Sequence, residues 1–136
     1  MSCRVLIVED EILVAIDIEA AIEDAGFEVV GIAADSTTAL AKAPDAEIAF
    51  VDLNLRDGLT GIDIGRRLAE EVGVTVIYMT ANPTLLGDGI SGTIGVLTKP
   101  CDHSVMHQAL EFAAARRLRM DAAATRPPEK LRLFQG

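Results

Sequence analysis

Ile48-Ala49-Phe50-Val51-Asp52 indicates the fold most clearly, because its first four residues are apolar and its last is an acid. The same pattern recurs elsewhere: Glu9 and Asp10 follow residues 4–8, Thr80 ends residues 76–80, and Lys99 follows residues 94–98. Apolar runs of this length, separated by helix-like segments, are typical of strands buried on both faces of a parallel sheet. The chain is therefore expected to form such a sheet, with polar residues where its strands end.

Five strand candidates alternate with helical segments along the chain. The strands are expected near residues 4–8, 28–33, 47–52, 75–80 and 94–98, and the helices near 11–25, 36–42, 60–71, 84–88 and 103–119. This alternation predicts an α/β fold, a doubly wound five-stranded parallel sheet flanked by helices on both faces. The helix near 84–88 is expected to be short, distorted or mobile, because Pro83, Gly87 and Gly89 lie in or beside it and an interior Gly costs a helix about 1 kcal/mol relative to Ala.

The length of 136 residues is typical of one domain, which we expect over residues 1–121. Residues 122–136 contain Pro127-Pro128 and show no clear period, so they are predicted to form a flexible C-terminal tail. No apolar run approaches the ~18 residues of a membrane span, and the start does not look like a signal peptide. We therefore expect a soluble, cytoplasmic protein without membrane insertion.

The charge argues against a nucleic-acid partner, and the cysteines and histidines argue against a zinc site. The formal net charge is −9, and the acids are concentrated before residue 116; residues 116–136 contain six Lys and Arg and two acids. A body this acidic repels nucleic acid, which we exclude as a partner. Cys3 and Cys101 lack metal-motif spacing, and His103 and His107 have no evident third ligand, so a zinc site is not expected.

Ligands of parallel sheets bind just beyond the carboxyl ends of the strands, so the polar strand-end residues should meet there. Glu9, Asp10 and Asp52 would then form a carboxylate cluster, and clustered carboxylates need a cation to ionise together. A few oxygen ligands with open positions suit Mg²⁺. The backbone carbonyl of Asn54, two residues past Asp52, could supply a further oxygen.

Asp52 is also a candidate nucleophile, since carboxylates form aspartyl-phosphates. Lys99 could pair with Asp52 at rest and with a phosphoryl oxygen later. Thr80 offers a hydroxyl donor to another phosphoryl oxygen. Together these groups would neutralise charge on a moving phosphoryl group, so phosphoryl transfer is the predicted chemistry.

Four motifs make residues 3–120 resemble the receiver domain of two-component response regulators. They are Val8-Glu9-Asp10-Glu11, Phe50-Val51-Asp52-Leu53-Asn54-Leu55, Met79-Thr80-Ala81 and Leu97-Thr98-Lys99-Pro100. Each motif is weak alone, but their order and spacing together are specific. The resemblance implies the flavodoxin-like receiver fold and, with no second domain expected after residue 121, a stand-alone receiver.

The resemblance also implies a mechanism. A histidine kinase or a histidine phosphotransfer protein would donate a phosphoryl group to Asp52, with Mg²⁺ or alternatively Mn²⁺ held by the acids and the Asn54 carbonyl. The metal ligands implied are Glu9, Asp10, Asp52 and Asn54, and the phosphoryl-binding and switch positions are Thr80, Ala81 and Lys99. The protein would signal by contact with a downstream protein, and would not be an enzyme beyond its own phosphorylation and slow dephosphorylation.

Departures from the family pattern concern how the signal is read. Receivers usually carry an aromatic residue three positions before the lysine, where this chain has Val96, and a Phe after Lys-Pro, where it has Cys101. The aromatic form of the switch is therefore expected to be absent. By resemblance, the face formed by the fourth helix, fifth strand and fifth helix shifts on phosphorylation, and dimerisation through this face is possible.

Four residues are candidates for docking a partner. Ile12, Leu13 and Ile16 fall off the buried face of the first helix, close to the acid pair, and Pro100 follows Lys99; ordinary flank packing is the alternative.

Two other functions stay open. One is a pseudo-receiver that binds partners without phosphorylation, and the other is an aspartate-nucleophile phosphohydrolase, which would want a second acid at Asn54.

Overall fold

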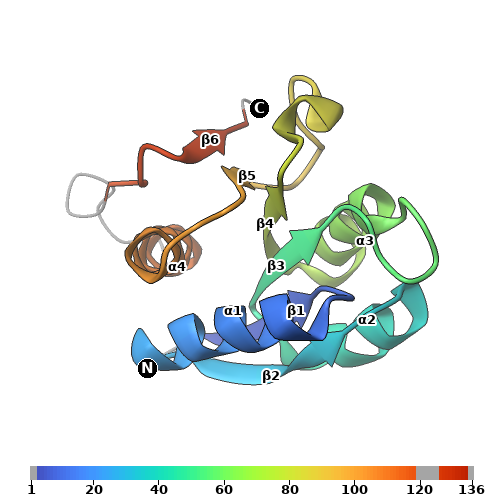
Figure 1. The fold of residues 1–136 in the computed structure, drawn as a ribbon, viewed down its shortest axis with the longest axis horizontal. Helices are drawn as coiled ribbons and strands as arrows, with labels where there is room; N and C mark the ends of the chain where they lie inside the picture. Colours follow the sequence, from blue (N-terminus) through green and yellow to red (C-terminus); the bar gives the residue numbers. More distant parts are fainter. Residues whose placement is uncertain (1–2, 119–125, 135–136) are drawn as a thin grey trace.

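The computed structural model describes residues 3–118 and 126–134 and shows one sheet covered by helices on both faces (Figure 1). The strand order is β2-β1-β3-β4-β5-β6, in which the first five strands are parallel and β6 is antiparallel to β5. The strands are β1 Arg4–Val8, β2 Glu28–Ala33, β3 Ile48–Asp52, β4 Thr75–Thr80, β5 Gly95–Thr98 and β6 Leu131–Leu133. The order reverses between β1 and β3, and in open α/β sheets such a switch point is where ligands bind.

Within the described residues, four α-helices and three short helical turns connect these strands. The helices are α1 Ile12–Asp24, α2 Ser36–Lys42, α3 Gly61–Arg67 and α4 His103–Arg117, and the turns are η1 Ala43–Asp45, η2 Leu68–Val72 and η3 Pro83–Leu86. The predicted doubly wound α/β fold is confirmed, and its first five strands lie where the apolar runs place them. None of these helices, in the part of the chain described, is long and apolar enough to cross a bilayer.

The sheet is buried on both faces, as its continuous apolar runs predict. Helices α1 and α4 pack on one face, where Ile18, Ile22 and Leu110 belong to the same apolar cluster as Ile7 and Phe50. Helices α2 and α3 cover the other face. Their apolar cluster includes Leu6 and Val51, the strand neighbours of Ile7 and Phe50, whose side chains point to the opposite side of the sheet. The alternation along β1 and β3 therefore divides one apolar run between two cores.

Strand β6 corrects two sequence predictions. Residues 131–133 form the sixth strand, so the sheet is six-stranded and mixed rather than five-stranded and parallel, and residues 122–136 are not a tail throughout. The predicted boundary near residue 121 lies outside the described residues. Three residues are too few to show the alternation of apolar and polar residues that indicates a strand. The strand also depends on pairing with β5, more than 30 residues earlier in the chain, which local sequence does not reveal.

The fourth helix is reduced to the 3₁₀ turn η3, which confirms the prediction of a short, distorted helix. It begins at Pro83 and ends at Leu86, and the next residue, Gly87, has a φ of 52° in the region that favours glycine. Gly89 follows with a φ of 128°. Mobility of this segment stays a prediction.

Candidate functional site

The predicted strand-end residues meet at one edge of the sheet. Glu9 and Asp10 follow β1, Asp52 ends β3, and Thr80 and Lys99 stand at the ends of β4 and β5. One carboxylate oxygen from each of the three acids lies within 4.8 Å of the others. The structure thus brings the three acids together at the carboxyl edge of the sheet, where the sequence places them. Their role as metal ligands stays a prediction.

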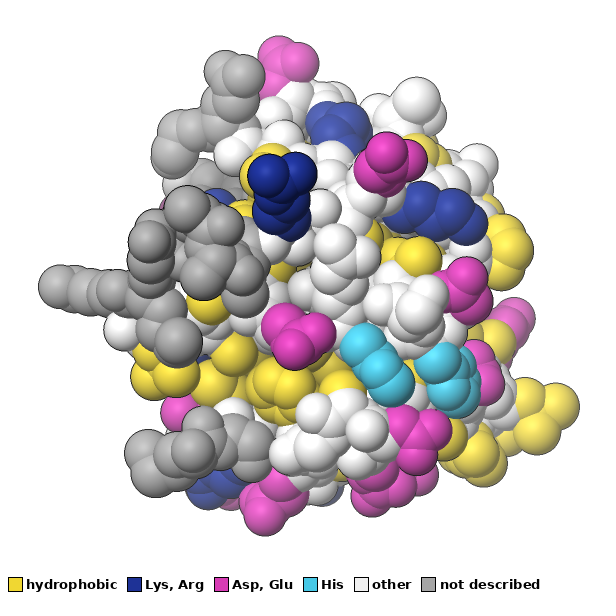
Figure 2. All heavy atoms as spheres, turned by 90° about the vertical axis from the view of Figure 1, so that its left-hand side faces the viewer, with side chains coloured by type: hydrophobic (Ala, Val, Ile, Leu, Met, Phe, Trp, Pro, Cys, Tyr) yellow, Lys and Arg dark blue, Asp and Glu magenta, His cyan; other side chains and the backbone are white. Residues whose placement is uncertain are grey.

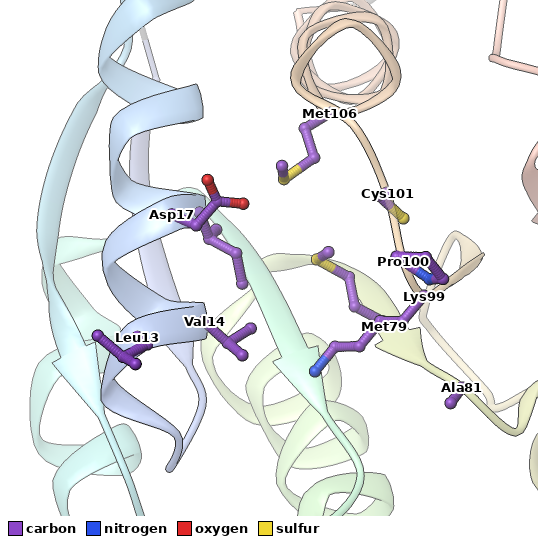
Figure 3. Close-up of a pocket in the computed structure, with 10 residues that line it drawn as sticks. Leu13, Val14, Asp17, Met79, Ala81, Lys99, Pro100, Cys101 and Met106 are labelled. Atoms are coloured by element: carbon purple, nitrogen blue, oxygen red, sulfur yellow. The ribbon is translucent and has the colours of Figure 1, made fainter.

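Lys99 contacts this cluster although it lies 90 residues after Glu9 in the chain. Its Nζ lies 2.7 Å from Glu9 Oε1 and 3.5 Å from Asp52 Oδ2. Figure 3 shows the Lys99 side chain reaching from the β5–α4 connection across the end of the sheet. The lysine is thus placed between the buried acid and the predicted nucleophile.

Burial sets the charge balance of the site. Glu9 is only 2% exposed, and its burial raises the pKa of its carboxyl, although the hydrogen bond from Lys99 opposes this rise. Burial alone would lower the pKa of Lys99, but its hydrogen bond to Glu9 and the charges of Glu9 and Asp52 outweigh that effect and raise it. Glu9 therefore favours the charged form of Lys99, whereas Lys99 only partly offsets the burial that disfavours ionisation of Glu9.

Asp52 is oriented by its own neighbourhood. Its Oδ1 accepts a hydrogen bond of 2.8 Å from the Leu53 N–H, which leaves Oδ2 facing Lys99. Gly61, at the start of α3, touches the backbone at Asp52 so closely that a Cβ there would overlap the Asp52 carbonyl oxygen. Glycine at this point lets α3 begin directly against the end of β3. Asn54 is exposed on the loop between them, and its role as a carbonyl ligand stays a prediction.

Thr80 stands beside Lys99 at the end of the neighbouring strand. It is 2% exposed, its Oγ1 accepts a 3.0 Å hydrogen bond from the Asn82 N–H, and its carbonyl accepts a 2.9 Å bond from the Lys99 N–H. The hydroxyl is therefore engaged with the segment that leads into η3. Ala81, next in the chain, is small and exposed.

A cavity of about 490 Å³ opens beside the acidic cluster, between α1 and the β5–α4 connection (Figure 3). Its walls are mostly apolar; they include Leu13, Val14, Ile18, Met79, Ala81, Pro100, Cys101 and Met106, with Asp17 and Lys99 as the charged members. Asp17, Met79 and Met106 were not predicted as wall residues. They come from three separate elements, so no spacing in the sequence could have indicated them.

Two of the predicted docking residues, Leu13 and Pro100, line this cavity, and Ile12 and Ile16 lie on the same helix as Leu13. Ile12, Leu13 and Ile16 are 61%, 80% and 49% exposed, which argues against flank packing for them, and Pro100 is exposed at the cavity wall. Their contact with a partner stays a prediction.

The two histidines lie side by side on the face shown in Figure 2, bordered by acidic side chains. His103 Nε2 lies 3.0 Å from Asp17 Oδ1, and His103 Nδ1 lies 3.9 Å from Asp24 Oδ2. These contacts tie the start of α4 to α1. The histidine thus helps to position the two helices that flank the cavity.

The fold and this constellation define a receiver domain: a mainly parallel α/β sheet with an acidic triad, a threonine and a lysine at its carboxyl edge. The family model for the response regulator receiver domain matches residues 5–111, and the chain belongs to this family. The sequence prediction of a receiver is confirmed.

Three relatives place the chain within the family. It is 34% identical over 128 residues to the phyllosphere-induced regulator PhyR of Methylorubrum extorquens, covering 88% of this chain and 48% of that protein. The crystal structure of the response regulator PhyR from Brucella abortus superposes with a TM-score of 0.73 at 33% identity, over 88% of this chain and 52% of that one. The receiver domain of the sensor histidine kinase PA1611 from Pseudomonas aeruginosa, solved with magnesium in its active-site cleft, gives a TM-score of 0.65 at 27% identity, over 82% and 96% of the two chains. The chain thus spans about half the length of the PhyR proteins it resembles.

Proposed function

We propose that Asp52 is the phosphoacceptor of this receiver domain. The observation that supports this most strongly is the position of its carboxylate, 13% exposed, with Oδ2 at 3.5 Å from the Lys99 ammonium and one oxygen in the cluster with Glu9 and Asp10. In transfer from a phosphohistidine, an Asp52 oxygen forms a bond to phosphorus while the phosphorus–nitrogen bond breaks and its electron pair returns to the imidazole. The product is an aspartyl-phosphate.

The acidic cluster suits a divalent cation. Glu9, Asp10 and Asp52 offer hard oxygen donors in small number, the set that Mg²⁺ and Mn²⁺ favour, and the Asn54 carbonyl is the proposed fourth ligand. A magnesium ion in the active-site cleft of the PA1611 receiver domain supports the same assignment here. When bound, the cation would neutralise part of the phosphoryl charge.

Lys99 and Thr80 bind the phosphoryl oxygens in this proposal. The Lys99 ammonium is already beside the acceptor, so a phosphoryl group on Asp52 offers it a new partner. The Thr80 hydroxyl can donate to another phosphoryl oxygen. Ala81, exposed beside them, leaves room for the group and for the water that later removes it.

We further propose that the phosphodonor protein, a histidine kinase or a histidine phosphotransfer protein, docks over the cavity beside α1. Ile12, Leu13, Ile16 and Pro100 give it an exposed apolar surface, and Lys99 and Ala81 place the same cavity next to the acceptor. Burying such side chains contributes to association in proportion to their apolar area. A downstream protein would read the phosphorylated state.

The test is phosphorylation by a small donor. The protein is incubated with acetyl phosphate and Mg²⁺, and intact mass spectrometry follows the addition of one phosphoryl group. We expect addition to the native chain and none to Asp52→Asn, with native-like addition to the exposed-acid control Asp45→Asn. A pseudo-receiver would gain no mass, and a phosphohydrolase would steadily release phosphate from phosphate esters; either result would overturn the proposal.

A further inference from the structure

Strand β6 closes the outer edge of β5. The pairs are Gly95 with Leu133, Val96 with Arg132 and Leu97 with Leu131, and the Phe134 N–H donates a 2.9 Å hydrogen bond to the Ile94 carbonyl. Figure 1 shows this C-terminal strand at the end of the sheet opposite to β2. An uncovered edge strand presents unpaired backbone groups and is a template for pairing with another chain. The chain thus covers, with its own C-terminal segment, the outer edge of the fifth strand.

The side chains of this segment fit the β5 edge specifically. Leu131 is 5% exposed and joins the core cluster on the α4 side of the sheet. Phe134 packs on the opposite side, with its ring centroid 6.5 Å from that of Tyr78. A Cβ at Gly89 would overlap the Phe134 ring, so glycine there leaves a slot for the aromatic side chain. Val96, which stands where the family usually has an aromatic residue, belongs to the same cluster as Phe134.

Arg132 attaches the strand to the segment after Thr80. Its guanidinium donates hydrogen bonds of 3.1 Å to the Pro83 carbonyl and 3.0 Å to the Gly87 carbonyl, at the two ends of η3, and lies over the Phe134 ring at 5.3 Å. Pro83 directly follows Asn82, whose N–H donates to the Thr80 hydroxyl. A short chain of contacts therefore links Thr80 to the C-terminal strand, and β5 links it to Lys99.

We propose that the β5 edge is a binding site for an extended polypeptide segment with arginine two residues before an aromatic residue, and that Arg132-Leu133-Phe134 occupies it in the resting state. This inference rests on the proposed phosphorylation of Asp52. When the Thr80 hydroxyl turns to a phosphoryl oxygen, it gives up the bond from Asn82, and the carbonyls that hold Arg132 move with η3. The strand then detaches, and a partner segment of the same chemistry pairs with β5 by strand addition.

The first test needs no phosphorylation. Amide hydrogen exchange of Phe134, measured by NMR on the full chain, reports whether β6 is paired. Arg132→Gln removes the two Arg132 hydrogen bonds and should speed this exchange by at least about tenfold. The loss of one hydrogen bond from a charged group is enough to raise the population of the unpaired strand by that factor. Leu133→Ala, at an outward-facing residue of the same strand, is the control and should change it far less. Equal effects of the two variants would overturn the role assigned to Arg132.

The second test adds Mg²⁺ and beryllofluoride, a phosphoryl mimic whose fluorine resonance reports adduct formation at Asp52. With the adduct formed, we expect faster exchange at Phe134 and tighter binding of a labelled peptide of residues 128–134, about tenfold in each measurement. The same peptide with Ala in place of its arginine should bind as weakly with the adduct as without it. An adduct with unchanged exchange and peptide binding would overturn this inference alone, whereas failure to form an adduct would overturn the proposed function and this inference with it.

Discussion

The ammonium of Lys99 lies 2.7 Å from the carboxylate of Glu9, although 90 residues separate the two in the chain. Glu9 is almost fully buried, so its negative charge depends on that contact. The same ammonium faces Asp52 at 3.5 Å. Lys99 therefore contacts both the buried acid and the proposed phosphoacceptor.

Lys99→Met should destabilise the protein, because it leaves the Glu9 charge buried without its partner. We expect the free energy of unfolding to fall by about 3 kcal/mol near neutral pH in the absence of divalent cations. Urea denaturation measures this change. Lys130→Met, at an exposed lysine, is the control and should be close to neutral. Similar losses in both variants would contradict a structural role for the Lys99–Glu9 pair.

Asp10→Asn should weaken divalent cation binding without unfolding the domain, because Asp10 is exposed and contributes one of three clustered carboxylates. We expect the affinity for Mn²⁺ or Mg²⁺ to fall by at least about tenfold, since even changes around metal ligands cost that much. Isothermal titration measures it, with Asp45→Asn as an exposed acid outside the cluster. Unchanged affinity would remove Asp10 from the proposed ligand set.

Gly65→Ala should be destabilising, although alanine normally favours a helix. A Cβ at this position in α3 would overlap the ring and hydroxyl of Tyr78, whose hydroxyl donates a 2.8 Å bond to the Ile62 carbonyl. We expect a loss of about 2 kcal/mol in the free energy of unfolding, typical of overpacking. In the Tyr78→Phe background, where the hydroxyl is gone, the same change should cost less. Additive effects of the two changes would contradict the contact.

Asp57 should make the thermal stability of the protein depend on pH in the acidic range, below pH 3.8. Hydrogen bonds from the Thr60 hydroxyl, at 2.6 Å, and from the Ser36 hydroxyl, at 2.7 Å, lower the pKa of its carboxyl from 3.8 to about 2. A carboxyl whose folded pKa is depressed contributes stability above its unfolded pKa and loses it as pH falls through its folded pKa. The Tm difference between the native chain and Asp57→Asn should therefore be full above pH 3.8 and shrink toward pH 2.

Thr60→Val supplies the control for this pH dependence. It removes the largest cause of the pKa shift, so the Tm difference caused by Asp57→Asn should be smaller in the Thr60→Val background than in the native chain. Thr60 stands at the start of α3, as the sequence predicts, but its hydroxyl donates to Asp57 rather than capping the helix. A pH-independent Tm difference would contradict the proposed hydrogen bonds.

Much of the site was predictable because parallel strands bring their carboxyl ends to one edge. Apolar runs predicted the positions of the strands closely: two of them end at Asp52 and Thr80, and two are followed by Asp10 and Lys99. The alternation of strands and helices then predicted that these polar residues share one edge of the sheet. The short η3 was likewise indicated by its proline and glycines. These features depend on local composition and period, which a sequence displays directly.

Which side chains contact one another depends on tertiary packing and could not be predicted. From the sequence, Lys99 is expected to pair with Asp52, yet its shorter contact is with Glu9, because side-chain reach and burial select the partner. Strand β6 went unpredicted, since three residues carry no period and their hydrogen bonds come from a strand far back in the chain. Local patterns of residue type were enough to predict the receiver fold and which residues stand at its carboxyl edge. The covering of β5 and the cavity beside α1 arise from contacts between distant segments, which no local pattern encodes.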